Sequence, residues 1–413
     1  MNTRQKVAVL GYFVALGCLG ACSGDGPVRP IEDPDVLVTV EFENYLSLER
    51  PREGFVFISD QDGHVLDCAP WTSTSKVVLR NTEVHPETVS LTIFENSDTR
   101  PAFSSEFAVP KGSVRKFPLW SYPVPSGMAM IHLRNAPNTL RYTMSANGFT
   151  YLGHVQPPRQ VALDVIGDTT DLYAMVVPEV GPPVGGWLRG LRAGGRDTVD
   201  FDSARDVAPL KNITFQIPEG GGWVICNART RVQNSLPSGK MMMDHVAIFD
   251  NVSDSLSLYL PTLDPTGVVL EFYQEFPGEP ESFYWQEIHG QLPSEVTNLE
   301  GDLAVVSATP DSVVIAAAFA WDRFLTLWRQ EKDYKVSWLV EGPRATEGQG
   351  LPSIPSEVAE LIPGFAREGF TIRTLEVYQE TSDGVVRSQG KKFRTDKMKR
   401  EREPIPPSLR YRR

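Results

Sequence analysis

Hydrophobic and polar residues alternate along most of the chain, which is the pattern of β-strands with one buried face. In the first clear example, VLVTVEFE at residues 36–43, Val36, Val38, Val40 and Phe42 share one face. Similar short segments begin at residues 54, 76, 89, 128, 140, 160, 171, 212, 223, 245, 256, 268, 303, 312, 335 and 371. Each of them is predicted to form a strand.

Turn residues separate these segments at short intervals, for example Asp62-Gly63, Asn147-Gly148 and Asp383-Gly384. Many short strands with frequent turns favour antiparallel β-sandwiches over an α/β fold. The sequence therefore predicts a mainly β protein with tandem antiparallel β-sandwich domains of the immunoglobulin type and a mixed C-terminal region.

Helical signals are few. The segment AWDRFLTLWRQEK at residues 320–332 suits an amphipathic helix or a strand. The segment PSEVAELIPGF at 355–365 is the clearest short helix, because it starts near Ser353 and meets a Pro-Gly pair at Pro363.

Composition suggests where the domains divide. Residues 22–35 are rich in Gly, Pro and Asp and predict a flexible tether. We expect one β-sandwich over 36–155, a second over 156–275, and a third β-rich region with short helices over 276–390. A basic, partly disordered tail is expected over 391–413.

The first residues have the layout of a secretory signal. Arg4 and Lys6 precede an apolar stretch over 7–16, and small residues follow. A bilayer-spanning helix needs about 20 apolar residues, so this stretch is too short to be one. We predict a signal peptide over 1–21.

The end of that signal contains two cysteines, Cys18 and Cys22. The residues Leu19-Gly20-Ala21 before Cys22 match the lipobox of bacterial lipoproteins, in which the cysteine is acylated. The residues before Cys18 fit less well, since Ala15 stands where Leu is wanted. Cys22 is thus the predicted lipid-bearing first residue. The alternative is an ordinary secretory signal cleaved near Ala21.

The chain carries a formal net charge of −12, but its tail is basic. Residues 391–413 contain ten Lys or Arg and three acidic residues. Such a tail suits anionic lipid head groups, an acidic partner or the protein itself, or is simply solvated. A nucleic-acid partner is not expected in the envelope.

After Cys22 only Cys68 and Cys226 remain. In an oxidising compartment they are candidates for one disulfide, although two buried thiols explain them as well.

No His/Cys cluster has zinc spacing, and no cofactor or metal is predicted. Asp60 and Asp62 fit a hairpin turn better than a calcium loop, because the twelfth position is Trp71. A looser acidic group at Asp197, Asp200, Asp202 and Asp206 fits a solvated loop.

The compact motifs of common enzymes are missing: no nucleophile elbow, zinc helix, phosphate loop or dinucleotide fingerprint occurs. This argues against an enzyme, although glycosidases have no compact motif. Aromatic residues alternate with carboxylates over 271–289, and Tyr273, Tyr284 and Trp285 are candidate glycan contacts. Paired carboxylates there would suit glycoside hydrolysis, the least favoured function. A half-buried strand pair explains the same residues.

The lipobox at 19–22, the short tether and the β-rich body together resemble surface lipoproteins of Bacteroidota. Among these, the chain weakly resembles the fimbrial anchor and accessory lipoproteins, which have transthyretin-like β-sandwich domains. The resemblance implies a non-catalytic protein, anchored in the bacterial outer membrane by its N-terminal lipid. Its partners would be other envelope or fimbrial proteins, in adhesion, anchoring or assembly. A glycan-binding surface lipoprotein is the alternative.

Overall fold

The computed structural model describes most of the chain between residues 33 and 393. The described ranges are 33–44, 53–72, 75–96, 101–119, 125–136, 139–146, 149–153, 160–165, 167–178, 184–202, 207–208, 210–216, 223–232, 241–250, 255–261, 268–276, 281–289, 301–330, 336–346, 348–380 and 385–393. Within these ranges, no helix combines the length and the apolar content needed to cross a membrane.

The structure is mainly β, as predicted, and every segment predicted to be a strand lies in one. The first strands are β1 (Val36–Asn44), β2 (Glu53–Ser59), β3 (Val65–Thr72), β4 (Lys76–Arg80), β5 (Thr88–Glu95), β6 (Ala102–Pro110), β7 (Ser113–Leu119), β8 (Gly127–Arg134), β9 (Thr139–Ala146) and β10 (Phe149–Gly153). They are followed by β11 (Gln160–Val165), β12 (Thr170–Pro178), β13 (Val184–Leu191), β14 (Arg196–Asp200), β15 (Val207–Ala208), β16 (Leu210–Gln216), β17 (Trp223–Val232), β18 (Met241–Asp250) and β19 (Ser255–Pro261). The last are β20 (Val268–Phe276), β21 (Glu281–His289), β22 (Leu303–Thr309), β23 (Ser312–Ala317), β24 (Arg323–Gln330), β25 (Val336–Pro343), β26 (Thr371–Glu380) and β27 (Val386–Lys392).

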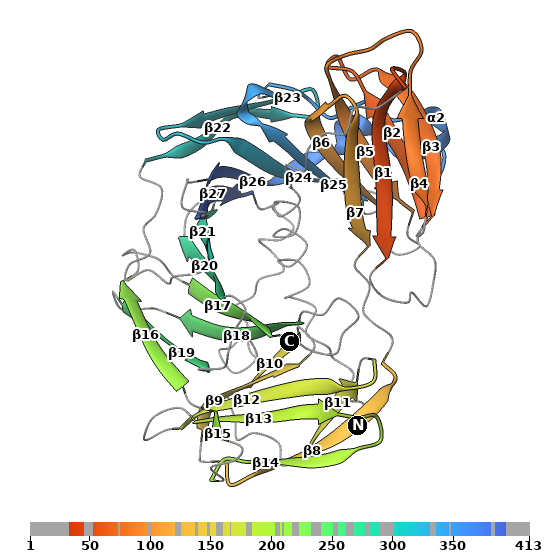
Figure 1. Cartoon of the computed structure of the whole chain (residues 1–413). Helices are drawn as coiled ribbons and strands as arrows, with labels where there is room; N and C mark the ends of the chain where they lie inside the picture. Colours follow the sequence, from red (N-terminus) through yellow and green to blue (C-terminus); the bar gives the residue numbers. More distant parts are fainter. Residues whose placement is uncertain are drawn as a thin grey trace.

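One large sheet runs through the molecule (Figure 1). It has twelve strands in the order β18-β17-β20-β21-β27-β26-β24-β25-β6-β5-β2-β3. Smaller sheets have the orders β4-β1-β7, β10-β9-β12-β13-β15, β11-β8-β14, β16-β19 and β22-β23. The strands of the large sheet thus come from both ends of the chain.

The N-terminal strands form a sandwich. The sheet β4-β1-β7 and the strands β2, β3 and β5 share a core that includes Val38, Val56, Leu79 and Leu91. Trp71 is 1 % exposed and stacks on Phe42 with 4.2 Å between the ring centroids. Leu37 and Thr39 are buried as well, so both faces of β1 are covered and not only the face predicted from the alternation.

The ambiguous segment at 320–332 contains strand β24, not a helix. β24 lies between β25 and β26, so both of its edges are paired. Phe324, Thr326 and Trp328 alternate along it and are all buried, because this face covers the large core.

The predicted short helix at 355–365 is present as α2 (Ser356–Ala359), followed by a turn. Two short 3-10 segments, η2 (Arg344–Thr346) and η3 (Arg367–Gly369), flank α2 in sequence.

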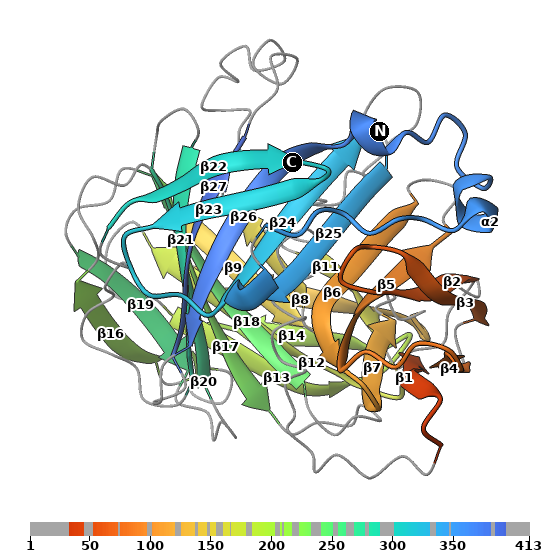
Figure 2. The same ribbon diagram turned by 90° about the horizontal axis from the view of Figure 1, so that it is seen from above.

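The N-terminal and C-terminal parts are joined by a parallel strand pair. Strands β6 and β25 pair from Ala102 with Ser337 to Glu106 with Glu341 (Figure 2). A single core lies beneath this junction. It contains Phe57, Phe94, Phe103, Phe107, Phe324, Trp328, Trp338, Phe370, Leu375 and Val377. About 230 residues of sequence separate the two paired strands, so this contact is decided by tertiary structure.

Strand pairing also crosses two of the predicted domain limits. Strand β8 pairs with both β11 and β14, across the limit at residue 155. Strand β20 pairs with β21 across the limit at residue 275. A separate core under β8 and β11–β14 contains Ile131, Leu163, Leu172 and Val199. The domain limits themselves stay predictions.

Candidate functional site

The predicted lipidation site lies outside the described residues, as do its lipobox residues Leu19, Gly20 and Ala21. Cys22 therefore stays a prediction from sequence. The basic tail also lies outside them, apart from its first residues at the end of β27.

The aromatic segment at 271–289 forms the paired strands β20 and β21, in agreement with its interpretation as a strand pair. Tyr284 is 2 % exposed, and its hydroxyl donates a hydrogen bond to Oε1 of Gln286 at 2.9 Å. Burial raises the pKa of Tyr284 above its ordinary value. Its ring lies against Phe272, 6.4 Å away between centroids. The prediction that Tyr284 contacts a glycan is wrong, because the side chain belongs to the core.

Trp285 is partly buried, on the opposite face of β21 from Tyr284. Its ring meets Tyr378 edge-on, with 6.4 Å between centroids and 77° between planes. The side chain of Tyr273, the third candidate, lies outside the described residues. Adjacent residues of a strand point to opposite faces, so Tyr284 and Trp285 cannot form one flat surface.

The candidate disulfide between Cys68 and Cys226 does not form, because Cys68 is a free cysteine. Cys68 lies on β3, at one end of the twelve-strand sheet. Cys226 belongs to β17, next to the other end, and strand neighbours in a sheet are about 4.8 Å apart. Partial burial, with the nearby carboxylate of Glu357, raises the pKa of Cys68 to about 12. Cys68 is thus a protonated thiol.

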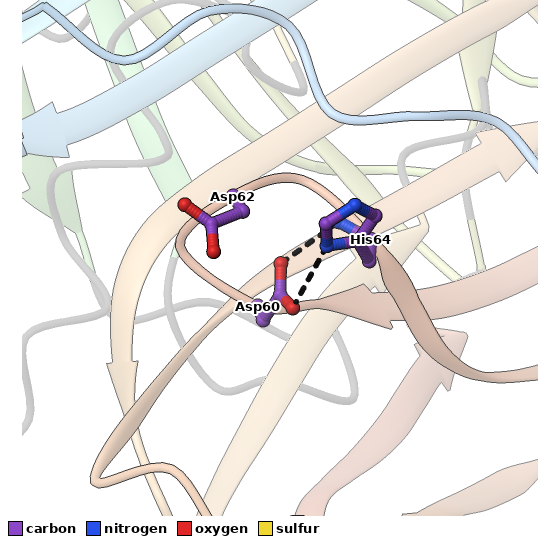
Figure 3. A group of neighbouring side chains, drawn as sticks. All are labelled: Asp60, Asp62 and His64. Carbon is purple, nitrogen blue, oxygen red and sulfur yellow. Dashed lines mark hydrogen bonds and ion pairs between the residues drawn. The ribbon is translucent and has the colours of Figure 1, made fainter.

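The hairpin turn between β2 and β3 gathers three side chains with metal-ligating atoms (Figure 3). One ligand atom each from Asp60, Asp62 and His64 lies within 4.8 Å of the others. His64 Nδ1 is 3.3 Å from Asp60 Oδ2, and the His64 amide donates to Asp60 Oδ1 at 2.8 Å. The predicted turn is therefore confirmed. The carboxylate of Asp60 already closes this turn through its own hydrogen bonds.

The second acidic group from the sequence is not brought together. Asp200 accepts a hydrogen bond from Asn135 Nδ2 at 2.8 Å, and Asp197 accepts from the next amide at 2.8 Å. Among the described residues, only the Asp60 turn forms a three-ligand group. Asp206 lies outside the described residues.

A cavity of about 350 Å³ opens beside that turn. Asp62, Asp311 and Arg367 line it. Arg367 forms an ion pair with Asp311, and its Nη2 donates to the carbonyls of Leu351 at 2.6 Å and Pro310 at 2.8 Å. These bonds attach the segment around residue 367 to the β22–β23 hairpin.

The face of the large sheet opposite its main apolar core carries charged residues that the sequence reading did not single out. At the junction, Arg323 of β24 forms an ion pair with Glu341 of β25 at 2.5 Å. Beside them, Arg115 of β7 pairs with Glu106 of β6 at 2.9 Å. Burial raises the pKa of Glu341, although the charge of Arg323 opposes this.

The row continues to Glu376 of β26, whose side chain is almost fully buried. Ser388 of β27 donates a hydrogen bond to Glu376, and the Tyr378 hydroxyl also bonds to this carboxyl. Burial is the main cause that raises the pKa of Glu376 from 4.5 to about 7. Next to it, Lys392 Nζ pairs with Oε1 of Glu275 at 2.5 Å.

One signal for the polar residues of β26 is visible in the sequence. In TIRTLEVY, Thr374, Glu376 and Tyr378 alternate with buried Leu375 and Val377, which reads as a strand with a solvated polar face. The burial of Glu376 depends on the position of β26 in the sheet. The local sequence pattern does not contain that information.

Compared with known proteins, the chain matches no protein-family model and no curated protein sequence.

Proposed function

We propose that this protein is a non-catalytic, lipid-anchored protein of the bacterial outer membrane that serves in adhesion, anchoring or assembly with other envelope proteins. The observation that carries the proposal is the lipobox Leu19-Gly20-Ala21-Cys22, followed by a short polar tether. Acyl chains on the new first residue would hold the β-rich body at the membrane surface, since two or more chains anchor stably.

One feature of the body argues against the glycan-binding alternative. Tyr284, one of the three candidate glycan contacts, is buried. Within the part of the chain that the structure describes, sheets such as β11-β8-β14 end in strands that pair with a neighbouring strand on one side only. Main-chain groups at sheet edges and the loops between strands are common sites of protein contact.

The anchor is tested by metabolic labelling with a clickable fatty acid in a bacterium that processes lipoproteins. We expect the wild-type protein and the matched control Cys18→Ala to be labelled and to fractionate with the outer membrane. Cys22→Ala should lose the label. Full labelling of Cys22→Ala, or loss of label in Cys18→Ala, would refute the choice of cysteine.

The assembly role is tested by cross-linking the native lipoprotein in cells, followed by mass spectrometry. Recovery of defined envelope or fimbrial proteins supports the proposal. Specific retention on a glycan array, without protein cross-links, would support the glycan-binding alternative instead.

A further inference from the structure

Glu376 occupies a position in the sheet interior that favours an uncharged side chain. Its side chain is 6 % exposed. Its two cross-strand neighbours are Leu325 of β24, which is buried, and Gly390 of β27, which has no side chain. Moving an isolated carboxylate from water into such surroundings costs several kcal/mol in proteins, so the group gains a proton instead.

The groups that contact the carboxyl directly are neutral. Ser388 Oγ on β27 donates to Glu376, and the hydroxyl of Tyr378 on β26 is its second hydrogen-bond partner. Hydroxyl groups can serve either protonation state, because they both donate and accept. They orient the carboxyl without neutralising a charge on it.

The charged groups that face this site each have a partner of their own. Lys392 of β27 is the cation that acts on Glu376, but its Nζ pairs with Glu275 of β20. On the other side, Arg323 of β24 pairs with Glu341 of β25. An ionised Glu376 would therefore have to draw Lys392 away from Glu275 or stay without a counter-ion.

We propose that Glu376 acts as a proton-controlled latch on the pairing of β26 with β27. With the proton bound, the carboxyl shares hydrogen bonds with Ser388 across the two strands, and Lys392 stays on Glu275. When the proton leaves, the buried charge destabilises this part of the sheet, and the strands open more often. This device goes beyond the proposed function and does not depend on it.

The direction of the effect follows from the two states of the group. The pKa of Glu376 is about 7 in the fold, against 4.5 in the exposed state. The closed strands therefore bind the proton more tightly than the opened ones. The stabilisation is complete below pH 4.5 and is lost as the pH rises to about 7. Over that interval the opening equilibrium changes by up to about 300-fold.

Hydrogen exchange of the full chain tests the latch, with the wild-type protein and Glu376→Gln compared at equal pH between 5 and 8. Glutamine keeps the size and the hydrogen bonding of a protonated carboxyl but cannot ionise. We expect the wild-type protection of β26 and β27 amides to lie at most about fivefold below that of the variant at pH 5, and at least about thirtyfold below it at pH 8. Glu380→Gln, at the exposed end of β26, is the matched control and should follow the wild type.

A second variant keeps the carboxyl and moves its midpoint. Ser388→Ala removes a hydrogen bond that lowers the pKa of Glu376, so the midpoint of the exchange change should move to higher pH. Equal pH dependence of the wild type and Glu376→Gln would overturn the proposal. An unchanged midpoint in Ser388→Ala would also overturn the proposal. This second test remains decisive if Glu376→Gln fails to fold.

Discussion

Ser105 joins the two ends of the chain through one buried hydrogen-bond group, and its removal is our most specific prediction for stability. The hydroxyl of Ser105 on β6 accepts a hydrogen bond from Trp338 Nε1 on β25 at 2.8 Å. It also shares a hydrogen bond with Thr92 Oγ1 on β5 at 2.7 Å. Trp338 and Thr92 are 0 % exposed and Ser105 is 2 % exposed, so water cannot replace the hydroxyl.

Ser105→Ala should therefore leave the indole N–H of Trp338 without a hydrogen-bond acceptor. A buried polar group left without its partner costs about 1–3 kcal/mol. The Thr92 hydroxyl loses a partner as well but can rotate, so we expect a loss of about 3 kcal/mol in the free energy of unfolding. Ser104→Ala, on the opposite face of β6, is the control and should cost less than about 1 kcal/mol.

The assay is urea denaturation followed by circular dichroism, with the midpoint compared at an unchanged slope. Trp338→Phe removes the indole N–H that Ser105→Ala leaves without an acceptor. The double variant Ser105→Ala/Trp338→Phe should therefore be more stable than the sum of the single changes predicts, by about 1–2 kcal/mol. Additive effects, within about 0.5 kcal/mol, would show that this hydrogen bond does not link β6 to β25 energetically.

Three further outcomes are expected. Gly390→Ala should destabilise the fold by about 2 kcal/mol in thermal unfolding, because its Cβ would lie 2.0 Å from the ring of Phe283. Adding Phe283→Leu should recover part of that loss, and no recovery would contradict the clash. Native Cys68 should react with iodoacetamide at pH 8 at least about 100-fold more slowly than in urea, by peptide mapping, because its pKa of about 12 leaves little thiolate. Arg367→Ala should speed proteolytic cleavage near residue 350, and Arg367→Lys should not fully restore resistance, since one ammonium cannot make all three guanidinium contacts. Full rescue by lysine would refute that reading.

Alternation along each strand was enough to predict the fold class, because side chains of a half-buried strand face core and solvent in turn. The hairpin turn at Asp62-Gly63 and the helix at 356–359 were also predicted, since both depend on adjacent residues. The segment at 320–332 was ambiguous locally, because its Phe, Leu and Trp residues suit either period. Its central place between β25 and β26 decided for a strand.

The candidate sites depended on tertiary structure to a greater degree. Tyr284 and Trp285 are neighbours in sequence, but they point to opposite faces of the sheet, and Tyr284 lies on a face that other parts of the chain cover. The pairing of Cys68 with Cys226 required a distance that sequence does not contain, and the strand order separates the two. Likewise, the burial of Glu376 depends on the tertiary packing around β26.

The sequence by itself was enough to predict the strands, the turns and the lipidation site at Cys22, because each of these depends on a few consecutive residues. Only the tertiary structure decided that β6 pairs with β25 and that one core unites the two ends of the chain. It also decided which polar side chains lose contact with water. Burial is a property of what packs over a residue, and that partner comes from distant parts of the chain.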